Sequence, residues 1–477
     1  MARSVKLNFI YNIALTLSTY IVSLLVFPHV SRVLGVDIIG KIGFATNVIN
    51  YFSLFALWGV TTVGVREIAE CGIDKEKRNS VFTNIFSIIL LFTSIITILY
   101  VVCIIYVPRF QNTREIFVLG SFILFFTSLL IEWFYQGIEN FRFITIRAVI
   151  IKIAYAACIF IFIKDKSDYI LYFFFTTALV VVNASINLLY SRNFVVFSYK
   201  TINISKYLKP IISLGIYRIL TSMYTTFNVV FLGFVSSDIE VGYYYTSTKV
   251  FYIVLGLLTA FSTVMMPRMS ALLSENKKDE FDKKIIISLD IVFLIALPLV
   301  IFSIILAPQI ISVLSGNGYE GAITPMRIVM LMIPITGLAQ IWVMQILIPL
   351  KKDKVILYSS LFGAIIGVSA NLLIVPSYGA IGSAIVILLS EIACNSVTLY
   401  YILKHNFLSF PISKLTINLC YSIPYILICS ITSTMINDTF TVILVSSITC
   451  LLYFIFNSCI LLKNKVVIDL LNNITHR

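Results

Sequence analysis

The sequence predicts an all-α integral membrane protein with about 14 transmembrane helices. Of its 477 residues, 59% are hydrophobic and only 12% are charged, and the mean hydropathy is +1.00. Soluble domains carry about 25% charged residues, so the composition excludes a soluble protein. Many apolar stretches have the length of about 20 residues that crosses a bilayer. They must be helical, because lipid offers the backbone no hydrogen-bond partners.

The predicted spans follow one another with short polar connections between them. The first six cover 11–34, 40–63, 81–107, 116–137, 145–163 and 169–190. The next six cover 210–235, 241–267, 285–307, 324–350, 355–375 and 380–403, and two more cover 415–436 and 440–462. The first stretch is too long for a signal peptide and is expected to be retained. We therefore expect an N-terminal lobe over 1–200, a C-terminal lobe over 201–408, and two added helices with a tail over 409–477.

The positive charge is distributed as in an oriented membrane protein. The net charge is +13, but the basic residues lie in short segments between apolar runs, which does not indicate nucleic-acid binding. Of the 35 Lys and Arg residues, 25 lie on the side of the N-terminus and six on the opposite side. The positive-inside rule therefore predicts cytoplasmic N- and C-termini. The remaining four fall within spans: Lys152, Arg218, Lys249 and Arg327.

The short loops argue against catalysis. The longest segment on the outer side is roughly 308–323. A membrane polysaccharide polymerase needs a larger outer loop to hold an acceptor and an acid/base pair, so the sequence predicts a protein that is not an enzyme. The three histidines are scattered and no CxxC motif occurs, so we expect no metal site and no cofactor.

Two pairs of short motifs indicate an internal duplication. Segment 37–40 (DIIG) matches 238–242 (DIEVG), and 133–136 (WFYQ) matches 342–345 (WVMQ), at offsets near 200 residues. Transporters are often built from two related halves. The matches predict two six-helix lobes related by a pseudo-two-fold axis along the membrane normal, with a substrate path between them.

Six segments in order along the chain give it a family resemblance. They are 27–35 (FPHVSRVLG), 64–69 (GVREIA), 132–142 (EWFYQGIENFR), 266–270 (MPRMS), 345–349 (QILIP) and 378–382 (YGAIG). The chain resembles the polysaccharide (O-antigen-type) flippases of the multidrug/oligosaccharidyl-lipid/polysaccharide (MOP) exporter superfamily. The resemblance covers nearly the whole sequence.

The resemblance implies a bacterial cytoplasmic-membrane flippase. Its partner would be a polyprenyl-pyrophosphate-linked oligosaccharide, moved from the cytoplasmic to the outer leaflet by alternating access and surrounded by membrane lipid. Glycan-assembly enzymes would be its functional neighbours. Two alternatives stay open: a multidrug/cation antiporter of the same superfamily, and an integral-membrane polysaccharide polymerase.

Cations at membrane depth are the first candidates for substrate contact. Charges within a bilayer are costly and usually face a polar cavity or a partner. Arg218 and Lys249 lie well inside the seventh and eighth spans, where they suit an anionic pyrophosphate. They could instead form salt bridges with Asp290 or Glu391.

The first and second spans supply further candidates. Arg32 lies near the outer end of the first span, where it could bind substrate or extend to the interface. Pro28 could hinge that helix. Arg66 is a further cavity cation, with a local ion pair to Glu67 as the alternative interpretation.

Three carboxylates are candidates for coupling or gating. Glu391 and Glu132 lie within spans twelve and four and could bind H⁺ or Na⁺, and Asp290 could form a cytoplasmic lock. A packing role beside Trp133 is the alternative for Glu132. The membrane potential alone could also drive outward movement of an anion.

Overall fold

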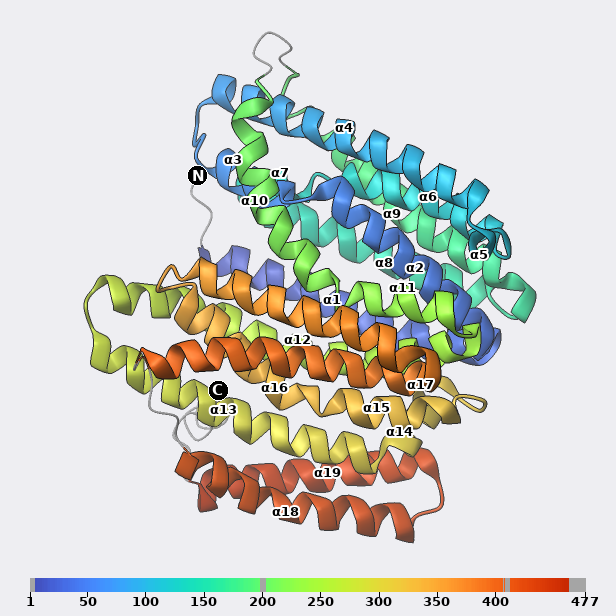
Figure 1. The fold of residues 1–477 in the computed structure, drawn as a ribbon, viewed down its shortest axis with the longest axis vertical. Helices are drawn as coiled ribbons and strands as arrows, with labels where there is room; N and C mark the ends of the chain where they lie inside the picture. The colour runs from blue at the N-terminus through green and yellow to red at the C-terminus, as the bar shows by residue number, and fades with distance from the viewer. Residues whose placement is uncertain (1–4, 198–202, 406, 408–411, 463–477) are drawn as a thin grey trace. The chain divides into compact units, whose positions relative to one another are not determined.

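In this computed structural model, all elements of the described residues are helices (Figure 1), as predicted. The structure describes residues 5–197, 203–405, 407 and 412–462. The tail predicted beyond residue 462 lies outside these ranges. The chain forms two compact units, one of Met1–Tyr245 with Gly367–Ser383 and one of Thr246–Ile366 with Ala384–Arg477.

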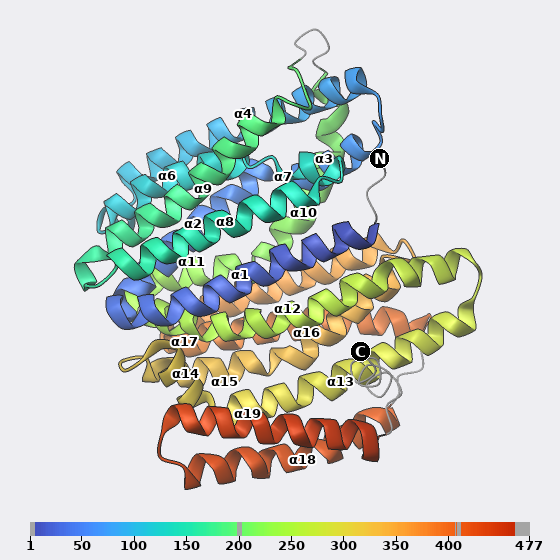
Figure 2. The ribbon, with the colours of Figure 1, turned by 180° about the vertical axis from the view of Figure 1, so that it is seen from behind.

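The first unit contains the helices of the N-terminal half. They are α1 (Val5–Leu34), α2 (Val36–Leu57), α3 (Val60–Ala69), α4 (Lys75–Tyr106), α5 (Pro108–Gln111), α6 (Arg114–Ser128), α7 (Glu132–Gly137), α8 (Phe141–Phe162), η1 (Lys166–Asp168), α9 (Tyr169–Ser191), α10 (Ser205–Ser222) and α11 (Thr226–Val235). Helix α1 packs along α8, and α8 along α9 (Figure 2). These three helices carry most of the polar groups considered below.

The second unit contains the remaining helices, apart from their residues up to Tyr245 and Gly367–Ser383, which belong to the first unit. They are α12 (Asp238–Ser274), which begins in the first unit, α13 (Lys278–Ile305), α14 (Ala307–Ser315), η3 (Glu320–Ala322), α15 (Ile323–Met330), α16 (Met332–Gln340), η4 (Ile341–Leu347), α17 (Asp353–Lys404), α18 (Ile412–Met435), α19 (Thr439–Phe456) and η5 (Asn457–Leu461). Helices α18 and α19 form an antiparallel pair (Figure 1). Helix α14 and the short helix η3 occupy most of the segment near 308–323 that the sequence suggested as a loop.

The number of membrane spans agrees with the prediction. Among the described residues, twelve helices are long and apolar enough to cross a membrane, and the pair α10 and α11, bent by 48°, adds a thirteenth. Helix α17 is 52 residues long and contains non-helical dihedral angles at Gly379. Close contact across this break shows that the chain reverses: a Cβ on Gly382 would lie 3.0 Å from the Cα of Val375. Dividing α17 at Gly379 gives the predicted fourteen spans.

Two predicted spans are interrupted. The second was expected over 40–63, but α2 ends before Trp58 and α3 begins after it. The fourth was expected over 116–137, but it divides into α6 and α7 around Ile131. Trp58 has φ 39° and Ile131 has φ 41°, positive values that are incompatible with a right-handed helix and end it. Average hydropathy does not detect such breaks, because the flanking residues remain apolar.

The matched segments of the predicted repeat contact each other within the first unit. A Cβ on Gly40 would lie 1.7 Å from the backbone oxygen of Asp238, and a Cβ on Gly242 would lie 2.2 Å from that of Val36. Gly242 and Asp238 lie 202 residues after Gly40 and Val36, so the two contacts join the same two positions of the repeat in opposite order. Such reciprocity is the mark of a two-fold contact. The two matched glycines therefore allow the two segments to approach each other closely.

Two of the recognised motifs pack directly on each other within the first unit. Trp133 of α7 is buried, and its ring stacks on Phe82 at a centroid distance of 5.6 Å. A Cβ on Gly64 of α3 would lie 2.5 Å from the Trp133 ring. This core holds the short helix α7 in place at the break in the fourth span.

Candidate functional site

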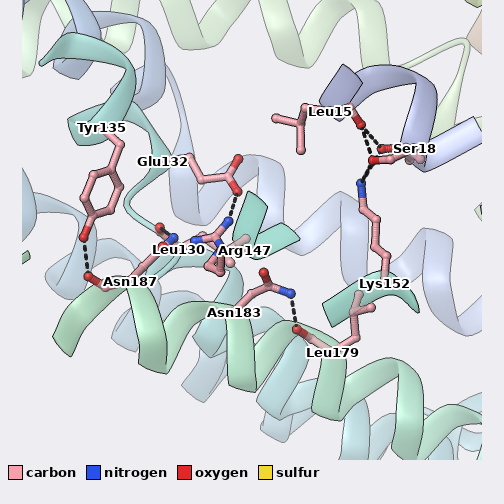
Figure 3. A network of polar contacts seen from close by, with 11 residues as sticks. Leu15, Ser18, Leu130, Glu132, Tyr135, Arg147, Lys152, Leu179, Asn183 and Asn187 are labelled. Carbon is pink, nitrogen blue, oxygen red and sulfur yellow. Dashed lines mark hydrogen bonds and ion pairs between the residues drawn. The ribbon is translucent and has the colours of Figure 1, made fainter. Parts of the chain in front are cut away.

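The break in the fourth span places polar backbone and side chains next to one another. The Leu130 carbonyl, just before α7, accepts a hydrogen bond from the Asn187 side chain of α9. Tyr135 of α7 donates its hydroxyl to the Asn187 carbonyl at 2.5 Å (Figure 3). Interrupted helices commonly form binding sites in transporters, because they bring backbone and side-chain polar groups to membrane depth.

Glu132, the first residue of α7, forms an ion pair with α8. The Arg147 Nη2 atom donates to Glu132 Oε1 at 2.9 Å (Figure 3). The Arg147 side chain is only 5% exposed, whereas that of Glu132 is 35% exposed. The guanidinium also lies 5.7 Å from the centroid of the Phe143 ring. A carboxylate in the first turn of α7 suits the positive end of the helix dipole.

Lys152 lies one and a half turns further along α8. Its Nζ donates to two hydroxyls of α1, Ser18 Oγ at 3.1 Å and Thr19 Oγ1 at 2.7 Å. The residue is about 16 Å from the start of α8 by helix rise, which is about half the thickness of the hydrocarbon core. Lys152 is therefore an ammonium near the middle of a predicted span.

These groups border a pocket of about 390 Å³. Its wall is made by α1, by the residues around the break before α7, by α8 and by α9. The lining residues are Leu15, Thr16, Thr19, Tyr20, Leu130, Glu132, Ala148, Lys152, Leu179, Val180 and Asn183. The volume lies within the range typical of small-ligand sites.

The polar lining of this pocket can both donate and accept hydrogen bonds. Asn183 donates through Nδ2 to the Leu179 carbonyl at 2.6 Å (Figure 3). Its Oδ1 is buried and has no hydrogen-bond partner among the described residues. Within that part of the chain, no group of three or more His, Cys, Asp and Glu residues could hold a metal. The pocket suits an organic ligand with hydroxyl or oxyanion groups.

A second cavity of about 670 Å³ lies elsewhere in the first unit. It is bordered by the starts of α6 and α9, and its charged lining residues are Arg114, Glu115 and Asp168. Arg114 and Glu115 are exposed, Asp168 is half-buried, and all three lie at helix ends rather than at membrane depth. We therefore take the smaller pocket as the candidate site.

The predicted cations of the first unit lie at several places. Arg218 of α10 is exposed and donates Nη1 to Thr61 Oγ1 at 3.1 Å. Arg32 is exposed in the last turn of α1, and Pro28 lies within the same continuous helix. Arg66, with a side chain 54% exposed, pairs with Glu67 at 3.1 Å, so the ion pair weighed from the sequence is present. Whether these cations contact substrate stays a prediction.

The other predicted residues belong to the second unit. Lys249 of α12 and Glu391 of α17 are half-buried. Asp290 of α13 lies 3.5 Å from Lys414 Nζ and accepts a hydrogen bond from Asn418 Nδ2 at 3.1 Å. Since Lys414 belongs to α18, this pair joins the added helices to α13. The role of Asp290 as a lock stays a prediction.

Of the predicted residues, Glu132 lines the pocket. Sequence reasoning missed its partner: Arg147 was counted among the cytoplasmic loop residues at the start of the fifth span, but it lies buried in α8. Lys152 was recognised as a cation within a span but was given no role. The available signal was that Glu132, Arg147 and Lys152 lie within 21 consecutive residues of two adjacent apolar spans.

The chain matches known protein families over most of its length. The model of a family described as "Polysaccharide biosynthesis protein" matches residues 5–273, and that of the MatE family matches 214–373. A relative named "Putative O-antigen transporter" from Escherichia coli (strain K12) is 26% identical over 418 residues, covering 85% of this chain and 98% of the relative. A relative of the same name from Shigella dysenteriae is 23% identical over 79% of this chain and 94% of its own length.

Solved structures show the same fold. The lipid II flippase MurJ, in an inward closed conformation, superposes with a TM-score of 0.80 at 14% sequence identity, over 96% of this chain and 99% of that one. An inward-facing multidrug resistance MATE family transporter of the MOP superfamily gives a TM-score of 0.59 at 15% identity, over 83% and 98% of the two chains.

The relatives are named as transporters and flippases rather than as enzymes, which confirms the prediction of a transporter and disfavours a polymerase. The family match covers more than half of the chain, and the fold, the multiple spans and the relatives agree with it. The chain therefore belongs to the polysaccharide biosynthesis protein family, as a multi-pass membrane transporter.

Proposed function

We propose that this protein is a flippase for polyprenyl-pyrophosphate-linked oligosaccharide, such as an O-antigen, capsule or exopolysaccharide repeat unit. It moves this substrate from the cytoplasmic to the outer leaflet by alternating access. The match to the polysaccharide biosynthesis family over residues 5–273 carries the proposal. The names of the relatives, an O-antigen transporter and a lipid II flippase, support it.

The chemistry of the substrate fits the polar groups of the chain. An oligosaccharide headgroup is too polar to cross hydrocarbon unaided and needs a path lined by hydrogen-bonding groups. The proposal assigns the pyrophosphate to the predicted cations Arg218, Lys249, Arg32 and Arg66. The lipid tail remains in the surrounding bilayer throughout.

The membrane potential supplies a direction. A potential negative on the cytoplasmic side favours outward movement of an anion by about 2.3 kcal/mol per charge per 100 mV. Two charges on a pyrophosphate therefore gain about 4.6 kcal/mol per 100 mV. Coupling to H⁺ or Na⁺ through Asp290, Glu391 or Glu132 would add to this drive. We place the protein in the bacterial cytoplasmic membrane with both termini inside, functionally next to glycan-assembly enzymes.

Depletion of the protein in its own host tests the proposal. The lipid-linked glycan of each leaflet is measured with an externally added glycan-modifying probe. We expect the glycan to accumulate in the inner leaflet and to be lost from the fraction that the probe reaches. An unchanged leaflet distribution would contradict flipping.

A multidrug/cation antiporter is the second candidate, favoured by the MatE match over 214–373. It predicts loss of resistance to cationic dyes on depletion, with no change in glycan distribution. The same depleted cells therefore separate the two functions.

A further inference from the structure

Lys152 carries the excess positive charge of the candidate pocket. Arg147 and Glu132 form an ion pair and neutralise each other. Lys152 donates to two hydroxyls, and no carboxylate of the described residues lies within ion-pair distance of its Nζ. The three charges together leave the pocket with one net positive charge.

The positive charge of Lys152 is energetically unfavourable within a membrane span. A lysine near the centre of a bilayer is destabilising unless a polar cavity or a partner compensates its charge. The hydroxyls of Ser18 and Thr19 solvate the ammonium, but they do not neutralise it. An ammonium has three donors, and two of them are used here. Among the described residues, no carboxylate accepts the third hydrogen bond.

The remainder of the lining suits a hydroxylated ligand beside an anion. Thr16, Thr19 and Tyr20 on α1 contribute hydroxyl groups, and Asn183 on α9 contributes a buried Oδ1 with no partner among the described residues. Hydroxyls serve as both donors and acceptors, and the amide oxygen accepts. Sugar hydroxyls meet all of these requirements.

A coupling cation fits this pocket less well. Glu132 is its acidic lining group, and the Arg147 guanidinium already occupies the position of a counter-ion to that carboxylate. Lys152 on α8 borders the same space, and the groups that face it from α1 and α9 are neutral. A Na⁺ ion would therefore enter a site of net positive charge.

We propose that the pocket between α1, α7, α8 and α9 binds an anionic group of the transported glycan-lipid, with Lys152 as its charge partner and Asn183 as an acceptor for an adjacent hydroxyl. The anion is a phosphate oxygen or a sugar carboxylate, which share the chemistry that Lys152 recognises. The inference rests on the proposed flippase function and adds a substrate-binding residue to it.

Binding to the full-length protein in nanodiscs tests this assignment. Inorganic pyrophosphate, glucuronate and glucose are titrated separately by calorimetry into the wild type, Lys152→Met, Lys152→Arg and Lys354→Met. Lys354 is an exposed cation at the start of α17 and serves as the control for loss of one positive charge. Equilibrium unfolding of each variant shows whether the fold is retained. Methionine has a similar length and no charge to bury, so stability should not fall.

We expect the wild type to bind at least one anion more tightly than glucose. Loss of a charge-assisted hydrogen bond should weaken that binding about tenfold to hundredfold in Lys152→Met. Lys152→Arg should retain most of the affinity, and Lys354→Met should match the wild type. Preference for pyrophosphate identifies the lipid phosphate as the ligand, and preference for glucuronate identifies an acidic sugar.

Two results would overturn the assignment. One is equal anion affinity of Lys152→Met and the wild type, and the other is absence of anion binding by the folded wild-type protein. Either result leaves the proposed function intact if depletion still redistributes the glycan between leaflets. If depletion leaves the leaflets unchanged, the flippase proposal fails whatever the pocket binds.

Discussion

Removing the charge of Glu132 should destabilise the protein more than removing its partner. In Glu132→Gln, the Arg147 guanidinium stays buried, and its Nε and Nη1 have no protein partner among the described residues. Breaking a fully buried pair in this way costs about 3–5 kcal/mol. The carboxylate is 35% exposed, so the pair is incompletely desolvated, and we expect a loss of about 3 kcal/mol, at the lower end of that range.

Removing the charge of Arg147 instead leaves the Glu132 carboxylate, which water can reach. In Arg147→Met, the remaining carboxylate is partly solvated, and the cation–π contact with Phe143 is lost at a cost of about 0.5–1 kcal/mol. We therefore expect a loss of about 1 kcal/mol in this variant and a similar loss in the double variant. The coupling energy of the pair is then about 3 kcal/mol.

Equilibrium unfolding of the wild type, the two single variants and the double variant in mixed micelles measures this double-mutant cycle directly. The pair Arg66 and Glu67 is the matched control. The Arg66 side chain is 54% exposed, so water solvates this guanidinium when its partner is removed, and the cycle should give less than about 1 kcal/mol. A smaller loss in Glu132→Gln than in Arg147→Met would refute the reasoning. So would a coupling energy no larger than that of the control.

Two further predictions concern contacts away from the pocket. Gly40→Ala should lower the unfolding midpoint more than Gly337→Ala. At position 40 the new Cβ would lie 1.7 Å from the backbone oxygen of Asp238, which cannot move aside easily. At position 337 the new Cβ would meet only side-chain atoms, the nearest at 2.8 Å. Equal midpoints would show that the repeated segments can separate at little cost. Lys414→Met should change the free energy of unfolding by less than about 1 kcal/mol, because this lysine and Asp290 are both partly exposed. A larger loss would show that this pair is essential to the docking of α18.

The helices could be predicted from the sequence because an apolar segment in lipid must satisfy its backbone hydrogen bonds within itself, as an α-helix does. Every long apolar run had to become a helix, and the predicted gap between spans eleven and twelve coincides with the reversal at Gly379. The repeat also left a readable signal, because Gly40 and Gly242 are required by the same close approach.

The site was less predictable because it depends on a break inside an apolar run. Ile131 adopts a left-handed conformation although no glycine or proline marks the position. This break turns Glu132 towards Arg147, a residue that charge counting had placed in a loop. Hydropathy shows that a charge lies within a span, but it does not show which of its neighbours on other helices will compensate it.

Transport by the purified protein tests the central claim most directly. Proteoliposomes containing a polyprenyl-pyrophosphate-linked oligosaccharide are prepared with and without the protein, and a glycan-modifying enzyme is added outside. The account predicts that the enzyme modifies only the outer-leaflet glycan of empty vesicles, but nearly all of the glycan when the protein is present. Equal modification in both preparations, together with protein-dependent movement of a cationic dye, would contradict it.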